Sequence, residues 1–304
     1  MARRHSDPQI SVVSCHHLGD LVNRCLAALA IQRGVTFLTY VVTSDPHRTF
    51  PGTTTIHSTE GPAEKRNIAA RLCQTPYLVF LDDDVELDRD CLKHLWYGME
   101  QRPNAGMAFS KILNMERRDE FDDVGSFLTW TGFLWARAEN GLRDTGQFNQ
   151  AQRILSSKSA TCIARRLAFE SVGGFDASYY ILGEETDLSW RLWLQRHEVW
   201  YLPRAVSWHA FNTKFKPIPK HYTLERIHFH GAKNYVSCLA TNLGTARLAW
   251  MLPTHICGWL LAAAGFAMRG QIRRAYHILR GLLWHLTHVR TTLAHRATVQ
   301  SRRY

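Results

Sequence analysis

Residues 77–84 read Tyr-Leu-Val-Phe-Leu-Asp-Asp-Asp, and this stretch decides the fold. Its apolar half is typical of a strand buried in a parallel sheet. Asp82, Asp83 and Asp84 would then stand at the carboxyl end of that strand, on the rim of the sheet. Adjacent carboxylates repel one another, so a positive partner is expected, and a hard divalent cation bound by oxygen atoms is the simplest one. The alternative is a solvated loop whose aspartates cap the next helix.

Strand and helix patterns alternate before this stretch. Strands are predicted at residues 10–15 and 37–43, and amphipathic helices at 20–33 and 60–74. This alternation predicts an α/β fold with a doubly wound, mostly parallel, Rossmann-like sheet, which binds ligands at the carboxyl ends of its strands.

The pattern is less regular after the aspartates. Residues 114–155 are rich in Gly, Trp and polar residues, and they are predicted to form long loops over one edge of the sheet. The other predicted elements are strands at 105–110 and 159–164, a helix at 188–196, and edge strands at 199–202 and 205–209.

A second acidic cluster follows further along the chain and reads Gly183-Glu184-Glu185-Thr186-Asp187. A carboxylate that lies beside a metal-bound substrate can act as a general base. The alternative is that these residues only begin a helix, where the helix dipole favours negative side chains. Taken together, the two clusters predict a metal-dependent transfer reaction on a phosphorylated substrate.

The charge of the chain is unevenly distributed. The 304 residues carry a formal net charge of +11, yet no Asp or Glu follows Glu225. The excess of Lys and Arg therefore lies in residues 226–304. Such asymmetry is typical of a segment that meets phosphates, either of nucleic acid or of anionic lipid.

The same C-terminal region is also apolar. Residues 249–268 contain no charged side chain, which is about the length that spans a bilayer. Apolar residues then recur every three or four positions from Ile272 to Leu286 among arginines, as in a basic amphipathic helix lying on a membrane. Because Arg247 and Arg269 flank the apolar stretch on both sides, an in-plane or re-entrant arrangement is favoured over a simple span. A solvated helical hairpin is the alternative.

These patterns predict two regions. Residues 1–225 are expected to form the catalytic domain, with a nucleotide-binding half at about 1–110 and an acceptor half at about 111–225. Residues 226–304 are expected to form a helical, membrane-associating extension. The seven cysteines include no C-x-x-C pair, which is typical of buried thiols in a reducing compartment. We therefore expect the protein at the cytoplasmic face of the inner or plasma membrane.

The order of several motifs resembles that of the family-2 inverting glycosyltransferases with the GT-A fold. The likeness runs from about residue 9 to 235, and it is similar in particular to non-processive bacterial members that resemble rhamnosyltransferases. The motifs are Ser44-Asp45, Glu64-Lys65-Arg66-Asn67, Phe80-Leu81-Asp82-Asp83-Asp84, Gly173-Gly174-Phe175-Asp176, Gly183-Glu184-Glu185-Thr186-Asp187-Leu188-Ser189-Trp190-Arg191 and Val206-Ser207-Trp208-His209.

The resemblance implies roles for these residues in binding a nucleotide-sugar donor with Mn²⁺ or Mg²⁺. The nucleotide would be bound by Asp45, Arg66, Asn67, Asp82 and Asp83, and the metal by Asp82, Asp84 and His209. Taken alone, Asp45-Pro46 is also an ordinary turn signal, and His209 could be a hydrogen-bonded histidine of the core.

In the family the catalytic base lies in a Glu-Asp pair, and this chain has Glu184-Glu185 there. The second position departs from the usual Asp, so which carboxylate acts is left open. Glu185 is favoured, and Glu184 and Asp187 are the alternatives.

The expected activity is the inverting transfer of a single sugar from a UDP- or dTDP-sugar to a glycan or lipid-linked acceptor in cell-surface polysaccharide assembly. The Q-x-x-R-W motif of processive synthases does not occur after the acidic cluster. No nucleic-acid partner is expected, and a homo-oligomer is left open. The alternatives are a nucleotidyl- or phosphotransferase using the same aspartates, a nucleic-acid-binding protein using the basic tail, and a binder that has lost turnover.

Overall fold

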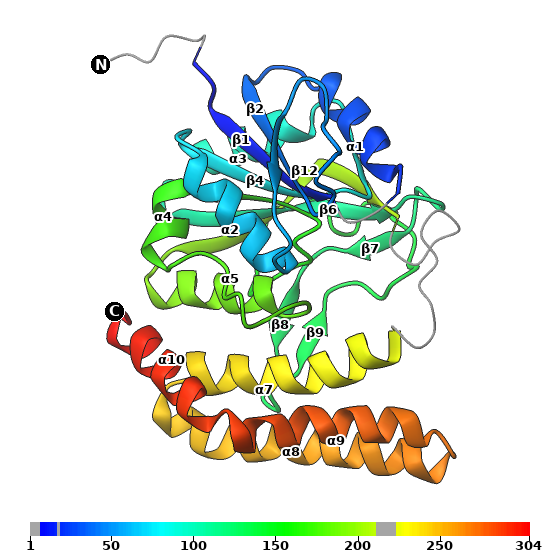
Figure 1. Cartoon of the computed structure of the whole chain (residues 1–304), viewed down its shortest axis with the longest axis vertical. Coiled ribbons are helices and arrows are strands. Elements are labelled where there is room, and N and C mark those ends of the chain that lie inside the picture. Colours follow the sequence, from blue (N-terminus) through cyan, green and yellow to red (C-terminus); the bar gives the residue numbers. More distant parts are fainter. Residues whose placement is uncertain (1–6, 17–18, 211–222) are drawn as a thin grey trace.

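The structure is a computed structural model that describes residues 7–16, 19–210 and 223–304. Its centre is a ten-stranded mixed sheet with a separate two-stranded hairpin beside it (Figure 1). The main path of the sheet runs in the order β10-β12-β6-β11-β4-β1-β2-β3, with β5 paired to β12 and β7 paired to β6. The strands of this path are β1 (Ile10–His16), β2 (Phe37–Thr43), β3 (Thr54–His57), β4 (Tyr77–Asp82), β6 (Ala105–Asn114), β10 (Gln152–Arg153), β11 (Thr161–Arg165) and β12 (Glu198–His209).

The predicted parallel sheet is confirmed. β1 lies between β2 and β4 and is parallel to both, and β12 is parallel to β6. β11 runs antiparallel to β4 and β6 and joins the two parallel parts. The short strands β5, β7 and β10 also run antiparallel to their partners. The register pairs Cys15 with both Val42 and Asp82, so β1, β2 and β4 end together on the same rim.

Helices cover both faces of this sheet, as a doubly wound fold requires. α1 (Leu21–Ala30) and α3 (Cys91–Glu100) cover one face and share a buried apolar core with it. α2 (Pro62–Leu72), α4 (Arg166–Ser171) and α5 (Glu184–Leu194) cover the other face with a second core. The apolar strands between them, such as Leu78 to Leu81, are buried on both sides.

Three predictions about elements were wrong in detail. The two predicted edge strands are one strand, β12, which lies inside the sheet between β10 and β6 and passes Pro203 through a register shift. Residues 114–155 are not only loop. They contain β7 (Phe121–Asp123), β10 and the hairpin that β8 (Ser126–Leu128) forms with β9 (Leu134–Ala136). The predicted helix at 188–196 begins earlier, since α5 starts at Glu184.

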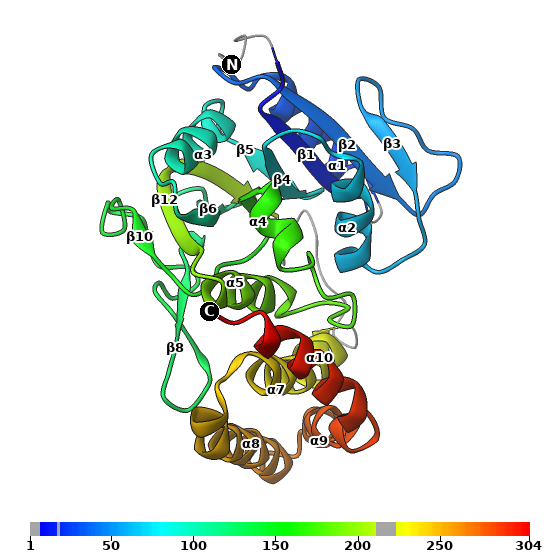
Figure 2. The same cartoon turned by 90° about the vertical axis from the view of Figure 1, so that its left-hand side faces the viewer.

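The C-terminal region is a bundle of helices packed beside the sheet (Figures 1 and 2). It begins with a short π-helical turn and continues through long helices: η1 (Glu225–His230), α7 (Gly231–Asn242), α8 (Thr245–Met268), α9 (Ile272–Thr287) and α10 (Val289–Ser301). Their common apolar core contains Ala232, Ala263 and Ile278. α7 lies between α5 and the outer helices α8 and α9.

Candidate functional site

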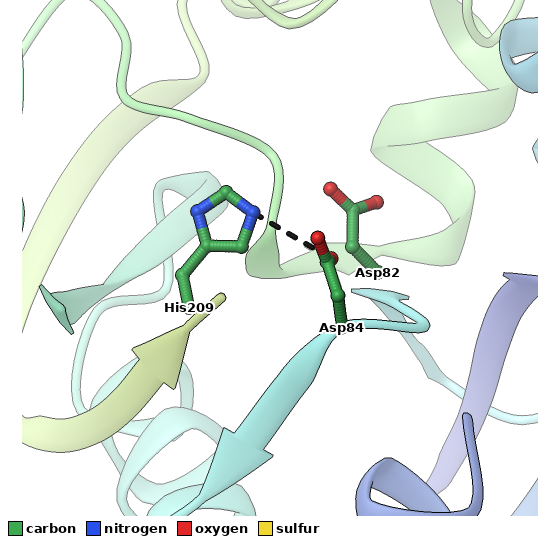
Figure 3. Close-up of side chains that lie close together, drawn as sticks. All are labelled: Asp82, Asp84 and His209. Atoms are coloured by element: carbon green, nitrogen blue, oxygen red, sulfur yellow. Dashed lines mark ion pairs between the residues drawn. The ribbon is translucent and has the colours of Figure 1, made fainter. Parts of the chain in front are cut away.

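The predicted metal ligands come together on the rim of the sheet. β4 ends at Asp82, the chain turns through Asp83 and Asp84, and β5 (Val85–Leu87) begins directly afterwards. β5 pairs antiparallel with the end of β12, which sets His209 opposite Val85. One ligand atom each of Asp82, Asp84 and His209 lies within 4.8 Å of the others, and Figure 3 shows the three side chains facing one another. Two carboxylates and an imidazole form a donor set that suits Mn²⁺ or a similar divalent cation.

A fourth residue orients the histidine. Nδ1 of His209 lies 2.8 Å from Oδ2 of Asp122, while Nε2 lies 3.5 Å from Oδ1 of Asp84. Asp122 is held in turn by Lys158, whose Nζ is 2.5 Å from Oδ1. A carboxylate on the far nitrogen is the usual support of a metal-binding histidine, because it fixes the ring and makes the other nitrogen more basic. The residues present therefore fit a divalent cation bound through Nε2.

The pKa values of this group follow from its charges. Burial lowers the pKa of His209, but Asp84 and Asp122 outweigh it and raise that pKa to about 10. Burial also raises the pKa of Asp122, but His209 and Lys158 outweigh it and lower that pKa to about 2. The imidazolium thus balances two carboxylates, and a cation bound at Nε2 would take the place of its proton.

Asp83 lies in the same turn but apart from the three clustered ligands. Its side chain is buried, as is that of Asp84, whereas Asp82 is partly exposed. Its predicted part in nucleotide binding stays a prediction.

Arg66 joins the first acidic cluster to the second. Its guanidinium lies 2.7 Å from Oδ1 of Asp82 through one nitrogen and 3.2 Å from Oε1 of Glu184 through the other. The side chain is only 6% exposed and lies over the ring of Phe175. Burial lowers the pKa of Arg66, but the two carboxylates outweigh it and the pKa is raised. The residue predicted to meet the nucleotide therefore also brings the two predicted acidic clusters to one place.

The three candidate bases differ in accessibility. Asp187 is completely buried, and its two oxygens accept hydrogen bonds from Arg191 at 2.7 Å and Asn242 at 2.8 Å. Glu184 is also buried and is paired with Arg66. Glu185 is only partly buried. Among the three, Glu185 is thus the residue that is partly exposed.

The environment of Glu185 suits a base. Burial raises its pKa well above the ordinary value of 4.5, the neighbouring charge of Glu184 adds to this, and Arg66 opposes it. A carboxylate with a raised pKa is a stronger proton acceptor once it is ionised. The hydroxyl of Thr186 is 3.3 Å from Oε1 of Glu185 and helps to orient it.

The remaining predicted nucleotide residues have different surroundings. Asn67 is buried, and its amide donates to the carbonyl of Phe175 at 2.8 Å and accepts from the Phe175 amide at 2.9 Å. It thereby fixes the turn at Gly174, where an added Cβ would come within 2.7 Å of its Oδ1. Asp45 is exposed after β2, and its carboxylate accepts a hydrogen bond from the amide of His47, as in an ordinary turn.

The sequence analysis missed two residues of the site. Asp122 is the most informative, because it orients His209, and its only signal was an acidic pair directly after Phe121 in a region predicted to be loop. Lys65 is the other. It is buried, and its Nζ lies 2.5 Å from the hydroxyl of Ser44, next to the rim where β2 ends.

Comparison with solved structures identifies the class of fold. GalNAc-T7 with UDP, GalNAc and Mn²⁺ aligns with a TM-score of 0.56 at 13% identity, over 88% of this chain and 59% of that one. The mannosyltransferase PcManGT from Pyrobaculum calidifontis, in complex with GDP-Man and Mn²⁺, aligns with a TM-score of 0.53 at 16% identity, over 97% of this chain and 86% of that one. The chain has the GT-A glycosyltransferase fold.

Sequence comparison shows which family part of the chain resembles. Residues 43–172 match the family model described as glycosyl transferase family 2. The chain is 33% identical over 132 residues to the O-antigen biosynthesis protein RfbC of Myxococcus xanthus, and 27% identical over 157 residues to the pre-mycofactocin glycosyltransferase of Mycobacterium tuberculosis. These matches cover 41% and 52% of this chain, but only 10% and 32% of those proteins. Residues 43–172 thus match the family-2 glycosyltransferases, as the order of the motifs predicted.

Proposed function

We propose that this protein is a metal-dependent, inverting glycosyltransferase of the hexosyltransferase type. It transfers a single sugar from a nucleotide-sugar donor, of the UDP or dTDP class, to a glycan or lipid-linked acceptor of the cell surface. The observation that carries the proposal is the link through Arg66. This residue holds the cluster of Asp82, Asp84 and His209 beside the pair Glu184-Glu185, so a cation site and a base lie together.

Each group has one task in this mechanism. Asp82, Asp84 and His209 would hold a divalent cation, which when bound neutralises the charge that grows on the leaving diphosphate. Glu185 takes the proton of the acceptor hydroxyl as the acceptor oxygen forms its bond to the anomeric carbon. The bond from that carbon to the diphosphate breaks in the same displacement, so the configuration inverts and no covalent enzyme intermediate is required.

The donor class can be tested by screening. We expect the purified protein with Mn²⁺ to release nucleoside diphosphate from one or a few nucleotide sugars in a panel that includes UDP- and dTDP-sugars. Adding EDTA should stop the release, and excess Mn²⁺ should restore it, because the leaving diphosphate needs the cation. Turnover of nucleoside triphosphates but of no sugar nucleotide would instead identify a nucleotidyl- or phosphotransferase.

We further propose that the outer face of the C-terminal bundle lies on an anionic membrane. Among the described residues, α8 is the one helix that is long and apolar enough to cross a membrane. It nevertheless packs against α7 and α9, and α9 carries Arg273, Arg274 and Arg280, so an in-plane position fits better than a span. The large apolar side chains exposed on α8 and α9 are Trp250, Leu260, Leu261, Met268, Ile272, Tyr276, Leu279, Leu283 and Leu286.

This surface supports the proposal that the acceptor is lipid-linked and that the protein acts at the cytoplasmic face of the membrane. Apolar side chains would enter the bilayer while arginines meet lipid phosphates, and residues 226–304 contain no acidic side chain to oppose them. A nucleic-acid ligand would use the arginines but would leave the exposed leucines in water. We therefore favour the membrane as the partner of this region.

Vesicle binding tests this surface. We expect the protein to sediment with phosphatidylglycerol-containing vesicles, and the double variant Leu283→Glu/Leu286→Glu to bind at least about tenfold more weakly, since each leucine contributes about 1.5 kcal/mol when buried. The matched control is Leu72→Glu/Leu167→Glu, which changes two exposed leucines of α2 and α4. Equal binding by the two double variants would contradict the assignment, as would binding to RNA but not to vesicles.

A further inference from the structure

α7 lies directly against the segment that carries the proposed base. We call residues 178–187, which run from Ser178 to Asp187, the base segment. The side-chain amide of Asn234, which is completely buried, donates to the carbonyls of Ile181 and Leu182 at 2.6 Å each. These carbonyls lie at the turn of Leu182 and Gly183, after which α5 begins.

That turn has an unfavourable backbone. Leu182 has a φ of 65° and Gly183 a φ of 89°, so two consecutive residues lie in the left-handed region. For leucine this conformation is strained and persists only where surrounding contacts hold it. Gly183 accommodates it, and a Cβ there would already touch the Cβ of Asn234 at 3.7 Å. The two hydrogen bonds from Asn234 are contacts of the kind that this turn needs.

α7 also holds both ends of the base segment. At the first end, Nζ of the buried Lys233 donates to the carbonyl of Ser178 at 2.9 Å. At the other end, the amide of Asn242 donates to Oδ1 of Asp187 at 2.8 Å, while Arg191 occupies Oδ2. Asn234 and Asn242 are two helical turns apart, so they lie on the same face of α7.

The position of Glu185 follows from these contacts. It lies between the turn that Asn234 holds and Asp187, which Asn242 holds. A displaced α7 would therefore displace the carboxylate that must reach the acceptor hydroxyl. The proposed metal ligands at the ends of β4 and β12 and in the turn after β4 would stay in place.

We infer that Asn234, supported by Lys233 and Asn242, is a positioning residue for the base, so that α7 belongs to the catalytic apparatus. The inference rests on the proposed function. It divides the C-terminal region, which the sequence predicts as one membrane-associating unit, into an inner helix that positions the base and outer helices that carry the proposed membrane-binding surface.

The test compares two side-chain amides that each donate to two backbone carbonyls. Asn234→Leu removes an amide that donates to two carbonyls of the base segment. Gln32→Leu removes an amide that donates to the carbonyls of Ala28 and Asp88, outside that segment. We expect Asn234→Leu to lower kcat about 10- to 100-fold, because a small misplacement of a catalytic group has an effect of this size. The affinity for UDP with Mn²⁺ should not change, and Gln32→Leu should keep its kcat.

A second measurement separates this inference from the proposed function. We expect backbone amides of residues 178–187 to exchange hydrogen faster in Asn234→Leu than in the wild type or in Gln32→Leu. Should the wild type transfer no sugar from any donor, the proposed function fails, while the exchange rates still decide whether α7 holds the segment. Lys233→Met, which removes one bond and keeps an apolar stem, is the milder variant if Asn234→Leu does not fold. Unchanged kcat and unchanged exchange in these variants would overturn the inference.

Discussion

Asp84→Asn should abolish turnover and the binding of Mn²⁺. The variant keeps the shape of the side chain but removes the charge that lies 3.5 Å from Nε2 of His209. Because the cation neutralises the leaving diphosphate, we expect a loss of at least about a thousandfold in kcat/KM. Titration of Mn²⁺ alone, followed by electron paramagnetic resonance of the free ion, should show the lost site directly.

The matched control for this variant is Asp90→Asn. Asp90 is an aspartate close by in sequence that precedes α3 and makes no side-chain cap hydrogen bond. It should retain both turnover and Mn²⁺ binding. Tight binding of Mn²⁺ to Asp84→Asn would show that the cation is bound elsewhere.

Glu185→Gln should abolish turnover while donor binding is retained. The amide has nearly the shape of the carboxylate but cannot accept the proton of the acceptor hydroxyl, so kcat should fall by about a hundredfold to ten-thousandfold. The affinity for UDP with Mn²⁺, measured by calorimetry, should stay near the wild-type value, because Asp82, Asp84 and His209 are unchanged.

Two further variants serve as controls for the assignment of the base. Glu170→Gln changes an exposed glutamate of α4 and should behave as the wild type. Glu184→Gln should retain more turnover than Glu185→Gln, since its side chain is buried against Arg66. The opposite order of the two activities would assign the base to Glu184.

The pH dependence of kcat/KM should also identify Glu185 as the base. Burial beside Glu184 raises the pKa of Glu185, so kcat/KM should fall with decreasing pH at values well above 4.5. The stability of the fold should change with pH in the opposite direction to kcat/KM. A folded-state pKa above the unfolded one stabilises the fold below pH 4.5, and this contribution is lost as the pH rises through the folded value. Glu185→Gln should therefore be at least as stable as the wild type at neutral pH.

The sequence predicted those parts of the site that local patterns encode. The apolar run before Asp82 predicted β4 and its place in the sheet, and the motif order predicted that Asp84 and His209 would meet. The helix that begins at Glu184 was predicted to begin only at residue 188, because its first turn is acidic and lacks the apolar spacing that identifies a helix.

The parts that were missed depend on pairings between distant segments. β7 has three residues, too few for a periodic pattern, and only its pairing with β6 places Asp122 beside His209. β12 was taken for two edge strands because Pro203 interrupts it, and its pairing with β6 continues past a bulge. The contact between α7 and the base segment has no local signal, since Asn234 and Leu182 are far apart in sequence.

The place of β12 has a consequence for the synthesis of the chain. Among the described residues it is the last strand in sequence, yet it lies between β10 and β6, both of which leave the ribosome earlier. The sheet is therefore incomplete until residue 209 has been translated, and the nascent chain exposes an open edge of β6 until then. His209 ends this strand, so the ligand set becomes complete only when the last strand has joined the sheet. Coordination of the proposed cation by all three ligands can thus follow, but not precede, closure of the sheet.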